Sequence, residues 1–110
     1  MNQSQEVTMY DMANLKRMGM LAKHAPEAMN AFTVFDRAAL ADGAIPVKYK
    51  ELMALAVAFT TQCPYCIELH ANKAREKGAS QAEIAESVLV AAALRAGGAI
   101  THGTHALKDI

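Results

Sequence analysis

Both cysteines of the chain, Cys63 and Cys66, lie three positions apart in the segment TQCPYCIELHANK, and His70 follows four positions after the second. Because Pro64 is favoured in the first turn of a helix, the segment predicts a helix that begins at the cysteines. Unpaired backbone N–H groups and the helix dipole stabilise a thiolate at such a position. Two cysteines at this spacing can also close a disulfide reversibly. The pattern predicts dithiol redox chemistry.

Two further residues are candidates for proton transfer. Side chains four residues apart share one face of a helix, so His70 is expected beside Cys66, where it can accept the thiol proton. Glu51 lies twelve residues before Cys63. If the helices on either side of the cysteines form an antiparallel hairpin, Glu51 and His70 can meet across it. The carboxylate would then fix the tautomer of the imidazole.

Other interpretations of these residues stay open. The cysteines can be small apolar side chains of a core, and Glu51 can be a solvated acid near a helix start. A zinc site would need His102 or His105 in addition to the cysteines and His70. The simpler interpretation of the two C-terminal histidines is that they lie on the surface or at an interface.

Composition predicts one all-α domain over residues 1–110. The chain is 53% hydrophobic, mostly Ala, Leu, Val and Met, with no Trp, which favours helices over strands. So much apolar side chain on a small domain predicts that another subunit covers part of it. Eleven basic and eleven acidic residues give a net charge of zero, so we expect no nucleic-acid partner.

The same sequence predicts a soluble, cytoplasmic protein with no membrane partner. The N-terminal MNQSQEVTMY lacks the basic and apolar regions of a signal peptide. The longest apolar run, residues 52–59, is far shorter than a bilayer span. Structural disulfides are rare in the cytoplasm, which again favours a redox or metal role for the cysteine pair.

Proline, glycine and capping residues divide the chain into helices. The SQAE sequence that starts at Ser80 is a capping box, and the apolar run 52–59 predicts a helix buried on all sides. We expect a first helix over about 10–23, a second from Pro26 to Asp42-Gly43, and a third from Pro46. A fourth is expected from Pro64 to Gly78, and a fifth from Ser80 to a break at Gly97-Gly98. A short C-terminal helix or tail would follow.

The spacing E-x11-C-x2-C-x3-H, here Glu51, Cys63, Cys66 and His70, resembles that of the AhpD-like alkylhydroperoxidases of the carboxymuconolactone decarboxylase superfamily. The segment from about 46 to 102 looks like the core domain of that family. The resemblance implies an orthogonal bundle of five to six helices. It also implies an obligate homo-oligomer, a trimer or a hexamer.

The resemblance also implies a thiol-dependent peroxidase that acts on organic hydroperoxides without cofactor or metal. Cys66 would attack the peroxide and become a sulfenic acid, and Cys63 would resolve it to a disulfide. His70 and Glu51 would form the proton relay, and an external dithiol would reduce the pair again. The founding enzymes have a histidine immediately before the second cysteine, where this chain has Tyr65.

We expect the substrate pocket between the third, fourth and fifth helices, with an apolar lining that favours organic hydroperoxides. Its expected lining residues are Leu52, Leu55, Phe59 and Val88, with Tyr65 at the mouth. A rival hypothesis is a dithiol–disulfide oxidoreductase or redox sensor that uses the same cysteine pair. A lactone decarboxylase ranks lower, because its chemistry does not depend on two cysteines, and a purely structural oligomer would make the four-residue pattern accidental.

Overall fold

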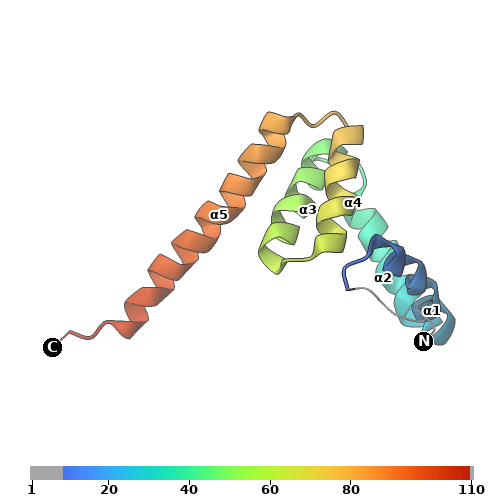
Figure 1. The fold of residues 1–110 in the computed structure, drawn as a ribbon, viewed down its shortest axis with the longest axis horizontal. Coiled ribbons are helices and arrows are strands. Elements are labelled where there is room, and N and C mark those ends of the chain that lie inside the picture. Colours follow the sequence, from blue (N-terminus) through green and yellow to red (C-terminus); the bar gives the residue numbers. More distant parts are fainter. Residues whose placement is uncertain (1–8, 110) are drawn as a thin grey trace, which may run out of the picture. The chain divides into compact units, whose positions relative to one another are not determined.

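The structure is a computed structural model that describes residues 9–109, and every regular element in that range is a helix. The prediction of an all-α protein is confirmed. The chain forms two compact units that divide after Val47. The elements in chain order are η2 (Met12–Arg17), α1 (Met18–His24), α2 (Pro26–Leu40), α3 (Val47–Thr61), α4 (Pro64–Glu76), α5 (Gln81–Gly103) and η3 (Thr104–Ala106) (Figure 1).

The first unit holds η2, α1 and α2, and local chemistry sets their ends. The Asp11 side chain accepts a hydrogen bond from the Ala13 N–H at 2.9 Å and caps η2. The helix expected over about 10–23 is therefore divided into a 3-10 segment and a short α-helix. Pro26 occupies the first turn of α2, as predicted. Asp42 accepts from the Val47 N–H at 2.8 Å in the turn that leads into α3.

In the second unit, α3 and α4 lie side by side as an antiparallel hairpin (Figure 1). The turn between them is closed by the Cys63 N–H, which donates to the Ala58 carbonyl at 3.2 Å. This bond is the six-residue closure of a Schellman motif, and it requires a left-handed residue at Gln62, whose φ is 56°. A non-glycine residue in that conformation costs about 1–2 kcal/mol.

Helix α4 ends, and α5 begins, with the residues that the sequence predicts. Gly78 ends α4 with a φ of 93°, which glycine adopts without strain. Ser80 Oγ accepts from the Glu83 N–H at 3.1 Å, and Glu83 Oε1 accepts from the Ser80 N–H at 2.9 Å, so the capping box is confirmed. The second oxygen of Glu83 pairs with Lys48 at 3.0 Å, which ties the start of α5 to the start of α3.

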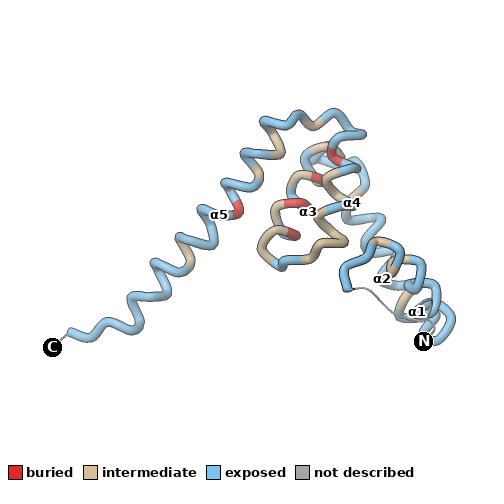
Figure 2. Tube along the Cα trace, viewed as in Figure 1, coloured by how far each residue is buried: buried red, intermediate tan, exposed pale blue. Residues whose placement is uncertain are grey.

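The buried core of this single chain is small. Among the described residues, the buried side chains are Glu51, Leu55, Ala58, Ala74 and Ala91 (Figure 2). The expectation that the run 52–59 is buried on all sides is wrong for the single chain. Only one face of α3 is covered, because α4 and α5 do not surround it.

Helix α5 differs from the prediction because it continues through Gly97 and Gly98 to Gly103. A glycine costs about 1 kcal/mol in a helix interior relative to alanine. That penalty does not stop a helix rich in Ala and Leu when no capping group is available to end it. The hydroxyl of Thr101 donates to the Gly97 carbonyl at 3.0 Å within the continued helix.

The large apolar side chains of α5 are mostly exposed, namely Val88, Leu89, Val90, Leu94 and Ile100. The stretch Gln81–Ala106 is long and apolar enough to cross a bilayer by length and composition. A bilayer would, however, place Arg95 near the membrane centre, where a charged side chain costs at least about 2.5 kcal/mol. We propose that a second copy of the chain covers this face of α5.

This proposal predicts that the protein runs as a multiple of its 11.8 kDa mass in size-exclusion chromatography with light scattering. Leu94→Glu should shift the mass toward the monomer, because it would bury a charge in the interface. Gln81→Glu adds the same charge to an exposed position of the same helix and should leave the mass unchanged. A monomeric wild-type protein, or a Leu94→Glu protein of unchanged mass, would contradict the proposal.

Candidate active site

The turn between α3 and α4 positions both cysteines. Cys63 is the N-cap residue of α4, and its Sγ accepts a hydrogen bond from the Cys66 N–H at 3.4 Å. The two Sγ atoms are 2.8 Å apart, within hydrogen-bond distance, and both residues are half-buried free thiols. Pro64 lies in the first turn of α4, as the sequence predicts. The structure therefore brings the pair together in its dithiol form at a helix start.

The pKa of the Cys63 thiol is lowered from its ordinary value. The main cause is the hydrogen bond from the Cys66 side chain, and the Cys66 backbone N–H is the next cause. Partial burial acts in the opposite direction, and the Tyr65 N–H adds a smaller lowering effect. Both leading causes are hydrogen bonds that stabilise the anion on Cys63, so the N-cap position favours a thiolate there.

The expected contact across the hairpin is present. His70 Nδ1 lies 2.5 Å from Glu51 Oε2, and Glu51 is buried while His70 is half-buried. A carboxylate can only accept, so Nδ1 carries the hydrogen and donates it. In the neutral ring, Nε2 is then an unprotonated acceptor. The arrangement prepares His70 to accept a proton at Nε2 and Glu51 to stabilise the imidazolium that forms.

The four residues of the spacing pattern come from one hairpin. Glu51 lies in the first turns of α3, Cys63 and Cys66 at the start of α4, and His70 in the middle of α4. Since Cys66 and His70 are four residues apart on α4, their side chains share one face of that helix. The hairpin therefore combines a dithiol with a base and its orienting carboxylate.

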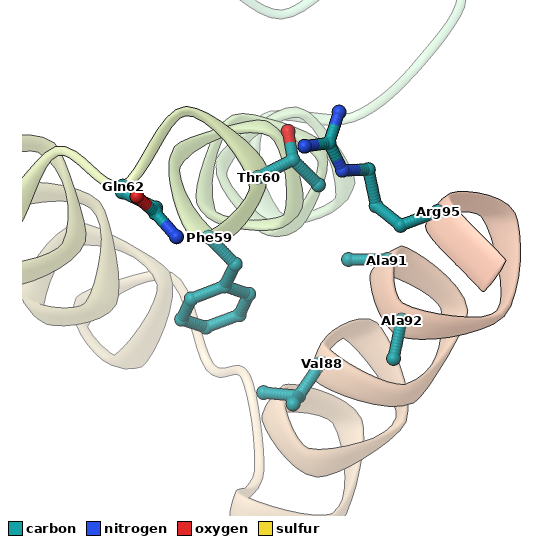
Figure 3. A pocket seen from close by; sticks show the side chains of 7 residues that line it. All are labelled: Phe59, Thr60, Gln62, Val88, Ala91, Ala92 and Arg95. Carbon is teal, nitrogen blue, oxygen red and sulfur yellow. The ribbon is translucent and has the colours of Figure 1, made fainter. Parts of the chain in front are cut away.

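A cleft of about 220 Å³ lies between α3 and α5. Its walls are formed by Phe59, Thr60, Gln62, Val88, Ala91, Ala92 and Arg95 (Figure 3). Phe59 and Val88, two of the expected pocket residues, line this cleft, but no residue of α4 does. Leu55 is fully buried in the core and does not line this cleft, while Tyr65 is half-buried in the first turn of α4.

Sequence reasoning did not select Arg95, although a signal for it exists. Between Glu86 and Lys108 it is the single residue with a fixed charge. A lone cation in so long an apolar segment has few structural reasons to be there, because charged side chains are usually distributed over the solvated face of a helix.

The C-terminal histidines lie apart from the hairpin chemistry in sequence and in contacts. His102 Nδ1 donates to the Gly98 carbonyl at 3.2 Å, and its ring centroid lies 6.2 Å from that of His105. Both residues are exposed. Within residues 9–109, no group of three or more His, Cys, Asp and Glu side chains has an arrangement that can hold a metal ion. The zinc-site alternative therefore has no support from the described residues.

Known proteins resemble this chain over most of its length. A protein of Paracoccus denitrificans named "uncharacterized protein 4 in cox locus" is 41% identical over 90 residues, which cover 82% of this chain and 81% of that protein. The crystal structure of an apo carboxymuconolactone decarboxylase family protein from Legionella pneumophila matches with a TM-score of 0.71 at 32% identity. That match covers 77% of this chain and 76% of the other.

A protein from Methanobacterium thermoautotrophicum also has a similar solved structure, with a TM-score of 0.74 at 30% identity over 80% of this chain and 99% of that one. The family model for the carboxymuconolactone decarboxylase family matches residues 26–109, which include α2, the cysteine pair, the Glu51–His70 contact and α5. On this match, and with the helical fold shared by the two solved structures, the chain belongs to the carboxymuconolactone decarboxylase family.

Proposed function

We propose that this protein is a thiol-dependent peroxidase that reduces organic hydroperoxides through its cysteine pair. The observation that carries the proposal is the Glu51–His70 contact at 2.5 Å on the hairpin that also holds two free thiols 2.8 Å apart. A buried carboxylate that fixes the tautomer of a histidine is a costly arrangement for a purely structural helix pair. It is the arrangement that an activated nucleophile needs.

In the proposed reaction, His70 Nε2 accepts the proton of the Cys66 thiol, and the Cys66 thiolate attacks the terminal oxygen of the hydroperoxide. The O–O bond breaks, Cys66 becomes a sulfenic acid, and the alkoxide takes the proton from His70 and leaves as an alcohol. Cys63 then attacks the sulfenic sulfur, forming the disulfide and releasing water. Two thiols are oxidised as one hydroperoxide is reduced, and an external dithiol restores the pair by disulfide exchange.

A single-turnover experiment tests this proposal. Reduced protein mixed with one equivalent of cumene hydroperoxide should lose two thiols per chain together with one peroxide. Cys66→Ser should leave the peroxide intact, because it removes the attacking sulfur, whereas Cys63→Ser should consume it and stop at the sulfenic acid. Thiols that persist beside intact peroxide in the wild-type protein would exclude the peroxidase function.

The Glu51–His70 contact predicts a second effect on the same reaction. Glu51→Gln should slow thiol oxidation about 10- to 100-fold, because the amide cannot stabilise the imidazolium as a carboxylate does. The rate is measured by stopped-flow loss of thiols, with circular dichroism to verify the helical fold. Glu68→Gln removes an exposed acid from α4 and should retain the wild-type rate. Equal rates in the two variants would mean that Glu51 has no part in proton transfer.

A second candidate function is dithiol–disulfide exchange, and the chemistry of Cys63 favours it. The Cys63 thiolate is the anion that the N-cap position and the Cys66 donors stabilise. It would attack a partner disulfide to form a mixed disulfide and release one thiol. Cys66 would then displace the second thiol, so that the protein is oxidised and the partner is reduced.

The lowered pKa of Cys63 gives this alternative its own test. Iodoacetamide should label Cys63 with a midpoint below the ordinary thiol value of about pH 8.5, as located by peptide mass spectrometry. Cys66→Ala removes the main donor and should move the midpoint upward, so labelling just below neutral pH becomes slower. A wild-type midpoint at the ordinary value would show that the N-cap sulfur is not the stabilised thiolate.

A further inference from the structure

We propose that the cleft between α3 and α5 binds a substrate that carries a carboxylate on an apolar body, with Arg95 as the carboxylate-binding residue. This inference rests on the proposed function, because it names the class of hydroperoxide that the cysteine pair would reduce. The cleft holds apolar walls, two neutral polar groups and a single cation (Figure 3).

The charge of Arg95 has no compensation from the protein. The structure shows no hydrogen bond or ion pair to its guanidinium among residues 9–109. Its neighbours on α5 at three and four positions in both directions are Ala91, Ala92, Gly98 and Ala99, and none of them is acidic. A guanidinium presents a planar fork of donors that matches a carboxylate in a bidentate pair. Arg95 is exposed, so its guanidinium is open to an anion from outside the chain.

The rest of the cleft is suited to a small apolar body. Phe59 of α3 faces Val88 of α5, and two alanines of α5 extend the same wall toward Arg95 (Figure 3). A volume of about 220 Å³ is below the range of drug-sized sites, so the ligand is of the size of one substituted aromatic ring or a short acyl chain. Without the cation, such a cleft would favour a neutral ligand, because burying a charge without a partner costs free energy.

The end of the cleft away from Arg95 is formed by a residue that is adjacent in sequence to the cysteine pair. Gln62 lines the cleft and directly precedes Cys63. Its φ of 56° is strained for a glutamine, whereas the equivalent position at the end of α4 is Gly78. A glycine at position 62 would relieve this strain, yet the chain has a glutamine there. Such backbone strain is typical of a residue whose side chain makes a functional contact. Arg95 would thus hold the carboxylate while the apolar body extends toward the cysteine turn.

Binding of a compound that cannot react tests the site without any turnover. The probe is 4-isopropylbenzoate, and the neutral control is 4-isopropylbenzamide, each titrated calorimetrically into the reduced wild-type protein. We expect the benzoate to bind about 5- to 10-fold more tightly than the benzamide, with the difference reduced at high salt. Arg95→Met should abolish the difference, and Arg95→Lys should restore part of it. Arg37→Met removes an exposed arginine of α2 and should change neither affinity.

A matched pair of substrates then connects the site to turnover. Cumene hydroperoxide and its para-carboxylate analogue differ only in the charged group, so Arg95→Met should raise the KM for the analogue and leave that for cumene hydroperoxide unchanged. The calorimetric result stands even if no peroxide is consumed, which separates failure of this inference from failure of the peroxidase proposal.

Three results would overturn the inference. The first is equal affinity of the wild-type protein for benzoate and benzamide, and the second is absence of binding by either compound. The third is an Arg95→Met protein that retains the preference for benzoate. If Arg95→Met instead changes the oligomeric mass and no benzoate preference exists in the wild-type protein, Arg95 is an interface residue and the carboxylate site does not exist.

Discussion

The contact between Glu51 and His70 is the constraint on which the second unit depends. Glu51 is the buried charged side chain among the described residues, and a buried carboxylate without a partner costs several kcal/mol. His70 supplies that partner at 2.5 Å from the neighbouring helix. The need for this contact fixes the register of α3 against α4, since sliding either helix by one turn would separate the two groups by about 5.4 Å. The same register places the cysteine pair at the turn.

The turn itself combines two structural tasks in Cys63. Its backbone N–H closes the end of α3, and its side chain caps the start of α4. A residue held at both ends cannot move independently of the hairpin, so the 2.8 Å approach of the two sulfurs is built into the fold. The left-handed Gln62 carries the strain of this turn. At the end of α4, which carries no proposed catalytic residue, the equivalent left-handed position is a glycine, Gly78.

The thin core explains why the remaining surface matters. One leucine and three alanines are the buried apolar residues described in this chain, and α5 leaves most of its large apolar side chains exposed. A unit of this size with so little burial gains much of its stability from surfaces that other molecules cover. The proposed copy-to-copy interface adjoins the cleft, because Val88 lines the cleft and Leu94 lines a neighbouring hollow together with Arg95.

The sequence by itself determined the helical class, most helix boundaries and the chemistry of the cysteine helix. These depend on local physics: proline at helix starts, the Ser80–Glu83 capping box and the four-residue spacing of Cys66 and His70. It also supplied the Glu51–His70 pair, but only on the assumption of a hairpin.

Tertiary structure decided the register that makes this contact, the burial of a single face of α3, and the position of Leu55 in the core. It also decided the continuation of α5 through Gly97-Gly98 and the place of Arg95 on a cleft wall. The register, the burial of α3 and the places of Leu55 and Arg95 depend on packing between segments distant in sequence, which no local pattern encodes.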